Sequence, residues 1–280
     1  MEVLSEHGCF GGVQGYYRHD SKECGLPMAF SVYRPPQAEV GPVPVLLFLA
    51  GLTCTHETFA IKAGAQRLAA EHGLMLLAPD TSPRGAGIDG EDTDWDLGTG
   101  AAFYLDAAQS PWDAHYRMES WLLQELIPLV RGGFPADPER LGICGHSMGG
   151  HGALTLALRH PDRFASVSAF APICAPSRCP WGEKAFSAYL GDDRDLWQAH
   201  DASALMQAAG TPRFDTILID QGLDDQFLAE QLHPDAFQQA CQGAGQGLEL
   251  RMHAGYDHGY FFIQSFIADH LAHHARKLVS

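Results

Sequence analysis

The run Gly145-His146-Ser147-Met148-Gly149-Gly150 constrains this chain more than any other segment. It follows an apolar, strand-like stretch at residues 140–144 and precedes a helix-like stretch at residues 151–160. The pattern G-x-S-x-G between a strand and a helix is typical of a nucleophile elbow, a sharp turn that exposes a serine hydroxyl at the edge of an α/β sheet. Glycines flank such a serine because a side chain would clash with the closely packed turn. We therefore predict that Ser147 is a catalytic nucleophile.

Apolar runs of strand length alternate with helix-like segments along the rest of the chain. From residue 44 onward most of these runs are almost continuously hydrophobic, as in strands buried on both faces of a parallel sheet. The expected strands are residues 28–34, 44–50, 74–79, 140–144, 164–170, 214–220 and 248–253. The expected helices are residues 59–71, 116–130, 149–159, 202–209, 234–242 and 260–277.

This alternation predicts a doubly wound α/β fold, with a mostly parallel sheet and helices on both faces. Residues 10–34 lack helical periodicity, so we expect them to supply one or two antiparallel strands at the sheet edge. No repeat, low-complexity tract or linker divides the sequence, and we expect residues 1–280 to form a single domain.

Charge and composition exclude several classes of partner. The net charge is −16, from 18 basic and 34 acidic residues, which argues against binding nucleic acid or an anionic membrane. Residues 1–6 lack the features of a secretory signal, and no apolar run is long enough to span a membrane. The seven cysteines contain no C-x-x-C pair and are odd in number. We therefore expect free thiols and a cytoplasmic protein without a zinc site, although Cys174 and Cys179 could pair.

A serine nucleophile needs a base and an acid, which follow it in the order Asp or Glu, then His, in an α/β-hydrolase fold. His258 lies in the turn after the expected strand at residues 248–253, at the same sheet edge as Ser147. Asp224 and Asp225 both lie in the turn after the strand at residues 214–220, and we favour Asp225 because it stands three residues after Gly222.

The chain has 15 histidines, so position and not rarity selects His258. The side chain of His146 is expected to point away from the nucleophile. The histidines of the last helix are expected to be solvated surface residues, and they are His270, His273 and His274.

An oxyanion hole requires two backbone N–H groups directed at the developing negative oxygen. Met148, which follows the nucleophile, is one expected donor. Leu52 is the other, because it lies in the loop after an early strand and Gly51 permits a tight turn there. Cys54 would then lie near the reacting centre, either as a small structural residue or as part of the acyl pocket.

Two long irregular stretches, residues 80–111 and 171–182, follow expected strands at the edge where such sheets bind ligands. They are either functional loops or surface decoration.

Several extended motifs make the sequence resemble the S-formylglutathione hydrolase (esterase D) family, in order and from end to end. These motifs are residues 51–55, 78–85, 95–104, 145–154, 179–182, 219–222, 225–228 and 255–258. The resemblance implies Ser147, Asp225 and His258 as a catalytic triad and Leu52 and Met148 as oxyanion donors. It also implies that Cys54 and Trp181 lie near the substrate. A departure at Cys144, where relatives often carry an aromatic residue, concerns packing and leaves the chemistry intact.

The family implies hydrolysis of the thioester S-formylglutathione to formate and glutathione, without a metal or organic cofactor, and a possible homodimer. The main alternative is a general short-chain carboxylesterase with the same triad. A sugar-ester hydrolase, an acyl-transfer enzyme or a non-catalytic binding protein on this fold is less favoured. Because glutathione thioesters are anionic and the chain is acidic, a local cation is expected at the site, supplied by Lys62, Arg84, Lys184 or another basic residue.

Overall fold

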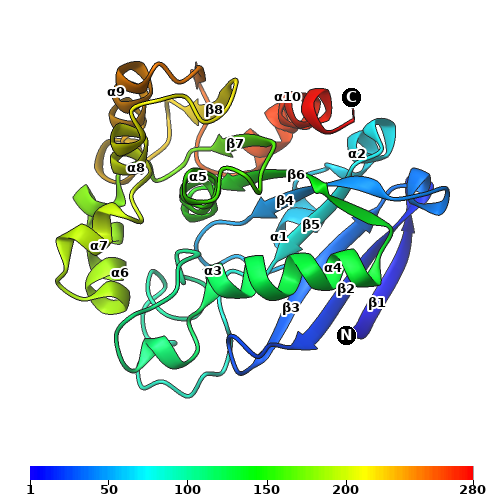
Figure 1. Cartoon of the computed structure of the whole chain (residues 1–280), viewed down its shortest axis with the longest axis horizontal. Coiled ribbons are helices and arrows are strands. Elements are labelled where there is room, and N and C mark those ends of the chain that lie inside the picture. Colours follow the sequence, from blue (N-terminus) through cyan, green and yellow to red (C-terminus); the bar gives the residue numbers. More distant parts are fainter. Residues whose placement is uncertain (280) are drawn as a thin grey trace.

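The computed structural model describes residues 1–279, and within them nine strands form one sheet. The strand order across the sheet is β1-β2-β3-β5-β4-β6-β7-β8-β9, so β1 and β9 are the edge strands. Figure 1 shows β1 at one side of the molecule. The strands are β1 (Glu2–Cys9), β2 (Gly12–Asp20), β3 (Pro27–Arg34), β4 (Val43–Leu49), β5 (Met75–Pro79), β6 (Ala136–His146), β7 (Ser166–Phe170), β8 (Ile217–Gly222) and β9 (Leu248–His253).

The sheet is antiparallel at one end and parallel elsewhere. Strands β1, β2 and β3 pair antiparallel, and β3 also pairs antiparallel with β5, whereas every pair from β5 to β9 is parallel. The chain passes from β4 to β5 on one side and then returns to β6 on the other side of β4. Ligand sites in open α/β sheets lie at such reversals, beyond the carboxyl ends of the strands.

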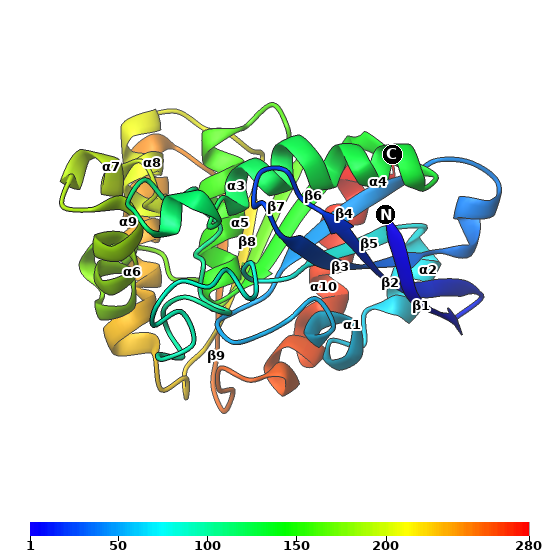
Figure 2. The same cartoon turned by 90° about the horizontal axis from the view of Figure 1, so that it is seen from below.

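Helices cover both faces of the parallel part of the sheet (Figure 2). One face carries α4 and α5, and the opposite face carries α2 and α10. The helices are α1 (Thr58–Lys62), α2 (Gln66–His72), α3 (Met118–Ser120), α4 (Ile127–Gly133), α5 (Met148–Arg159), α6 (Pro180–Leu190), α7 (Arg194–Gln198), α8 (Ala202–Ala209), α9 (Pro234–Ala244) and α10 (Tyr260–Leu278). A π-helical segment, Trp121–Leu126, joins α3 to α4.

The central strands are buried on both sides because helices pack against each face. Every residue of β4, β5 and β7 is buried, which explains why these strands lack the alternation of polar and apolar residues. The predicted doubly wound α/β class and the antiparallel edge are therefore confirmed.

Several boundaries differ from the sequence predictions. The helix expected over residues 59–71 is two helices, because Gly64 adopts a left-handed conformation (φ +66°) between α1 and α2. The expected loop at residues 171–182 already contains the start of α6, which opens on Pro180, a residue suited to the first turn of a helix. Strand β1 was not predicted, because its side chains are mostly exposed and polar.

The histidines of α10 lie in the interior, so the expectation of solvated surface residues is wrong. His274 is held between two serines of β7, with Nδ1 2.7 Å from Ser166 Oγ and Nε2 2.8 Å from Ser168 Oγ. His270 Nδ1 lies 2.8 Å from the same Ser168 Oγ, and His273 Nε2 donates to Val167 O at 3.1 Å. These buried rings are accommodated because β7 supplies polar partners on the face that α10 covers.

Candidate active site

Ser147 lies on the sharp turn between β6 and α5. Its backbone is at φ 56° and ψ −118°, a strained conformation for a residue other than glycine. Its N–H donates to Phe170 O at 3.0 Å, which ties the turn to the end of the neighbouring strand β7. A Cβ on Gly145 would collide with Gly149 O, and one on Gly149 would collide with Leu49 O. The glycines of the motif are thus required by the close approach of β4, β6 and α5 at this turn.

Asp225 and His258 meet beyond the carboxyl ends of β8 and β9. His258 Nδ1 donates to Asp225 Oδ2 at 2.6 Å, and the Asp225 side chain is fully buried. The other carboxylate oxygen, Oδ1, accepts from Phe227 N at 2.8 Å. This arrangement fixes the imidazole orientation and leaves Nε2 as the nitrogen available to accept a proton.

The turns that carry Asp225 and His258 are joined by main-chain contacts. Leu223 N donates to His253 O at 2.9 Å, and Asp224 N donates to Tyr256 O at 3.0 Å. A Cβ on Gly222 would lie 2.7 Å from Asp257 O, so glycine is needed for the two turns to approach. The side chain of Asp224 is exposed, whereas that of Asp225 faces His258.

His146 packs beside His258, with its ring centroid 4.6 Å from that of His258, a neighbour that the sequence did not predict. Burial lowers the pKa of His146 well below its usual value. His146 is therefore neutral and forms part of the wall behind the base.

Two backbone N–H groups at the site lack a protein acceptor among residues 1–279, and they belong to the expected oxyanion donors Leu52 and Met148. The loop that carries Leu52 is positioned by Thr53 N, which donates to Gly100 O at 2.9 Å. It touches the nucleophile, since a Cβ on Gly51 would lie 3.2 Å from Ser147 Cβ. Two unoccupied donors beside a serine provide the elements of an oxyanion hole.

Cys54 is partly buried at the end of this loop. Burial raises the pKa of its thiol, an effect that the nearby charge of Lys62 opposes only in part. The thiol is therefore predominantly protonated at neutral pH and is not an activated nucleophile.

Aromatic side chains line the approach to His258. The Phe227 ring meets His258 edge to face at 5.0 Å between centroids, and the Trp181 ring lies 4.7 Å from Phe227. Trp95, which is exposed, packs edge-on against Trp181 at 5.5 Å. Trp181 is thus separated from the base by a single aromatic ring, and Trp95 extends the aromatic surface into the long loop at residues 80–111.

Sequence reasoning assigned no role to Phe227 or Gln221, although both lie in motifs that it singled out. Gln221 is fully buried, and its Nε2 donates to Asp225 Oδ2 at 3.1 Å. Their closeness to Asp225 in the sequence, within four positions, could have indicated a role for both residues.

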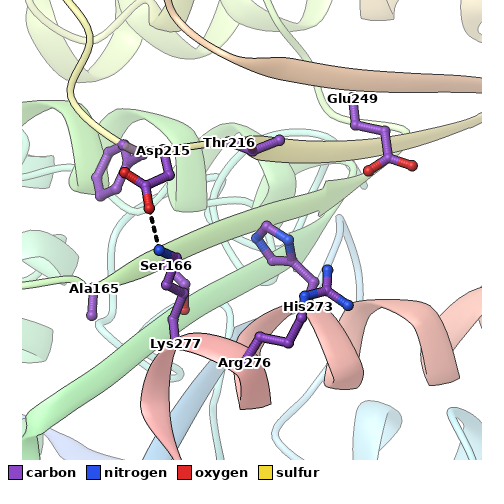
Figure 3. Close-up of a pocket in the computed structure, with 9 residues that line it drawn as sticks. Ala165, Ser166, Asp215, Thr216, Glu249, His273, Arg276 and Lys277 are labelled. Carbon is purple, nitrogen blue, oxygen red and sulfur yellow. Dashed lines mark hydrogen bonds and ion pairs between the residues drawn. The ribbon is translucent and has the colours of Figure 1, made fainter. Parts of the chain in front are cut away.

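A separate cavity of about 170 Å³ lies at the opposite, amino-terminal edge of the sheet (Figure 3). Ser166, at the start of β7, lines it together with His273, and the ion pair of Lys277 with Asp215 crosses its rim. It contains none of the predicted site residues. In the described part of the chain, no group of His, Cys, Asp and Glu side chains is arranged to hold a metal ion. None of the helices described combines the length and hydrophobicity that a membrane span needs.

Comparison with known proteins agrees with this architecture. The model of the Esterase family matches residues 21–273. The S-formylglutathione hydrolase of Mus musculus is 53% identical over 279 residues, covering 99% of both chains. That of Paracoccus denitrificans is 53% identical over 277 residues, covering 99% of this chain and 98% of the relative. The solved structure of an S-formylglutathione hydrolase from Agrobacterium tumefaciens superposes with a TM-score of 0.97 at 48% identity, covering 99% of this chain and all of that one. With its serine elbow and this degree of similarity, the chain belongs to the S-formylglutathione hydrolase family of esterases.

Proposed function

We propose that this enzyme hydrolyses S-formylglutathione to formate and glutathione, with Ser147, His258 and Asp225 as its catalytic triad. The observation that carries the proposal is the 2.6 Å hydrogen bond between His258 and the buried Asp225, beyond the same sheet edge as the strained Ser147 turn. Full-length similarity to hydrolases named for this thioester supports the substrate.

In the first step, Ser147 Oγ attacks the formyl carbonyl carbon while His258 Nε2 takes the hydroxyl proton. Asp225 stabilises the imidazolium that forms and keeps the ring in its reactive orientation. The N–H groups of Leu52 and Met148 donate to the oxyanion of the tetrahedral intermediate. When this intermediate collapses, the carbon–sulfur bond breaks and the imidazolium protonates the departing glutathione thiolate.

In the second step, water replaces glutathione. His258 Nε2 takes a proton from the water, whose oxygen attacks the formyl–serine carbonyl. Collapse of the second tetrahedral intermediate returns the proton to Ser147 Oγ and releases formic acid, which ionises to formate in water. A thiol has a pKa of about 8.5, so the leaving group needs little assistance.

Cys54 and Trp181 are proposed to bound the acyl pocket. Cys54 lies at the end of the loop that touches Ser147, and Trp181 reaches His258 through the ring of Phe227. A pocket bounded by the loop of Cys54 and by the indole of Trp181 would favour a small acyl group such as formyl.

The alternative is a general short-chain carboxylesterase, because the same triad cleaves oxygen esters. The two functions are separated by the ratio of kcat/KM for S-formylglutathione to kcat/KM for 4-nitrophenyl acetate and butyrate. The proposal requires the thioester to be preferred by at least about a hundredfold, which corresponds to about 2.7 kcal/mol of transition-state stabilisation. A ratio near one would identify a general esterase.

We further infer that the chain forms a single domain, acts in the cytoplasm and assembles as a homodimer. The continuous sheet supports the first inference, and the seven free cysteines are suited to a reducing compartment. The homodimer rests on the family resemblance alone. Sedimentation equilibrium at several concentrations would test it, and a single species of 30.4 kDa would contradict it.

A further inference from the structure

The proposed substrate presents an electrostatic problem. Glutathione carries two carboxylates and one ammonium group, so its thioesters are anionic, and the protein has a net charge of −16. Long-range repulsion therefore opposes binding, and a local cation must compensate. Three basic residues were expected as candidates, and the structure distinguishes them by their partners.

Two of the three candidates are neutralised by carboxylates. Lys184 Nζ contacts Asp96 Oδ1 at 2.5 Å and Asp94 Oδ2 at 2.8 Å, so this group of three carries a net negative charge. The Arg84 guanidinium holds Asp80 through Nε at 3.0 Å and NH2 at 2.8 Å. Neither cation is available to a substrate carboxylate without breaking these contacts.

Lys62 differs from both. It is exposed, and within residues 1–279 it makes no ion pair with a carboxylate. Its ammonium group lies 5.9 Å from the centre of the Tyr260 ring, on which it rests as a cation–π contact. This contact directs the charge toward the protein surface around Tyr260 and leaves its hydrogen-bond donors free for a ligand.

Two aromatic rings connect Lys62 to His258. Lys62 ends α1, the helix that follows the oxyanion loop, and its carbonyl accepts a hydrogen bond from Gln264 Nε2 of α10 at 2.5 Å. The Tyr260 ring lies 5.9 Å from that of His146, which in turn lies 4.6 Å from that of His258. The charge also reaches Cys54, since it lowers the pKa of that thiol against the larger effect of burial.

We propose that Lys62 is the specificity residue that binds a carboxylate of the glutathione moiety, an inference that rests on the proposed function. In extended glutathione the glycyl carboxylate lies roughly 7 Å from the thioester sulfur, and the carboxylate of the γ-linked glutamyl group lies farther away. The ammonium of Lys62 is separated from His258 by the rings of Tyr260 and His146, so it suits a carboxylate that lies well away from the reacting carbonyl. The contact is made equally in the ground state and the transition state, so it acts on KM and leaves kcat largely unaffected.

The principal test compares Lys62→Ala, Lys62→Arg and a matched control, Lys22→Ala. Lys22 is exposed in the turn between β2 and β3, so its replacement removes the same unit charge far along the sheet from the site. For Lys62→Ala we expect KM for S-formylglutathione to rise about fivefold to tenfold, as for one exposed ion pair of about 1 kcal/mol. The selectivity over 4-nitrophenyl acetate, which is uncharged, falls by the same factor. Lys62→Arg recovers most of it, and Lys22→Ala retains the wild-type ratio.

A second measurement separates failure of this inference from failure of the proposed function. S-methylglutathione is used as a competitive inhibitor of 4-nitrophenyl acetate hydrolysis, so thioester cleavage is not required. We expect its Ki to rise about fivefold to tenfold in Lys62→Ala, and to rise less at 0.5 M salt, where the charge is screened. Equal Ki values for wild type, Lys62→Ala and Lys22→Ala would overturn the assignment of Lys62. Absence of S-formylglutathione hydrolysis by the wild type, with Lys62-dependent inhibition preserved, would overturn the substrate instead.

Discussion

Gln221 Nε2 donates a hydrogen bond to Asp225 Oδ2 at 3.1 Å, the same oxygen that accepts His258 Nδ1 at 2.6 Å. Gln221 also donates to Gly222 O at 3.0 Å, which fixes its amide in the buried end of β8. Because both donors share one oxygen, Gln221 partly offsets the negative charge that His258 experiences. The glutamine is thus a positioning residue for the carboxylate that orients the base.

Replacing Gln221 by leucine should lower kcat. Without the amide donor, Asp225 Oδ2 loses one of the two side-chain contacts that hold it, so the carboxylate orients His258 less well. A hydrogen bond worth about 1 kcal/mol predicts a fall in kcat of about fivefold with KM little changed. The control is Gln226→Leu, an exposed glutamine of the same turn. A lower unfolding free energy with an unchanged kcat would mean that Gln221 serves only packing.

Asp225→Asn should abolish most of the activity, because an amide cannot stabilise the imidazolium and favours the wrong tautomer. By analogy with other serine hydrolases we expect kcat to fall about 10³–10⁴-fold. Asp224→Asn removes an exposed carboxylate from the adjacent position and should leave kcat within about twofold, as for a surface substitution. Steady-state kinetics with 4-nitrophenyl acetate measures both variants, and equal effects would refute the choice of Asp225.

Gly51→Ala should impair the oxyanion loop. The added Cβ would lie 3.1 Å from His146 Nδ1 and 3.2 Å from Ser147 Cβ, so the loop must move and carry the Leu52 N–H with it. Loss of one oxyanion donor predicts a fall in kcat of about 10²–10³-fold with KM little changed. Gly41→Ala is the matched control, since nothing lies within 4 Å of its added Cβ. A predominant effect on KM would indicate that the loop binds substrate and leaves the oxyanion to other donors.

Trp181→Ala should relax the preference for small acyl groups. Removing the indole opens space next to Phe227, whose ring lies 4.7 Å away, so longer acyl chains gain room. We expect the kcat/KM ratio of acetyl to hexanoyl esters, which differ by four methylenes, to fall at least about tenfold, because even one methylene is worth about 1–3 kcal/mol. If the ratio stays unchanged, Trp181 does not bound the acyl pocket, and Trp95 or Phe227 becomes the next candidate.

The sequence predicted the positions of the candidate catalytic residues relative to the strands better than it predicted the side chains around them. The elbow at Ser147 and the post-strand turns of Asp225 and His258 follow from local patterns, because parallel strands bring their carboxyl ends to one edge. The burial of β4 and β7 was equally predictable, since a continuous hydrophobic run indicates a strand that is covered on both faces.

Side-chain partners between distant elements were not predictable in the same way. The burial of His274 depends on Ser166 and Ser168, more than 100 residues earlier in the chain. Likewise, Lys184 and Arg84 differ from Lys62 because the fold brings carboxylates next to those two cations. Such pairings are set by tertiary packing, which a single sequence does not encode as a local pattern.

The buried histidines should make the fold sensitive to mild acid. Burial lowers the pKa of His151 to about 3 and those of His200 and His273 to about 4, whereas each titrates near 6.5 when unfolded. The unfolded chain therefore binds more protons as pH falls from about 6.5 to about 4. Stability is complete above this window and is lost within it, by about 1.4 kcal/mol per pH unit for each neutral histidine.

Urea unfolding at pH 7.5, 6.5 and 5.5 measures this loss, and His273→Gln identifies one contributor. Glutamine retains a donor for Val167 O, which His273 Nε2 contacts at 3.1 Å, but cannot take up a proton. We expect the slope of unfolding free energy against pH between pH 6.5 and 5.5 to decrease by about 1 kcal/mol per unit. His7→Gln, an exposed histidine of β1, should leave the slope unchanged. A slope unaffected by His273→Gln would mean that this ring is already protonated in the native state.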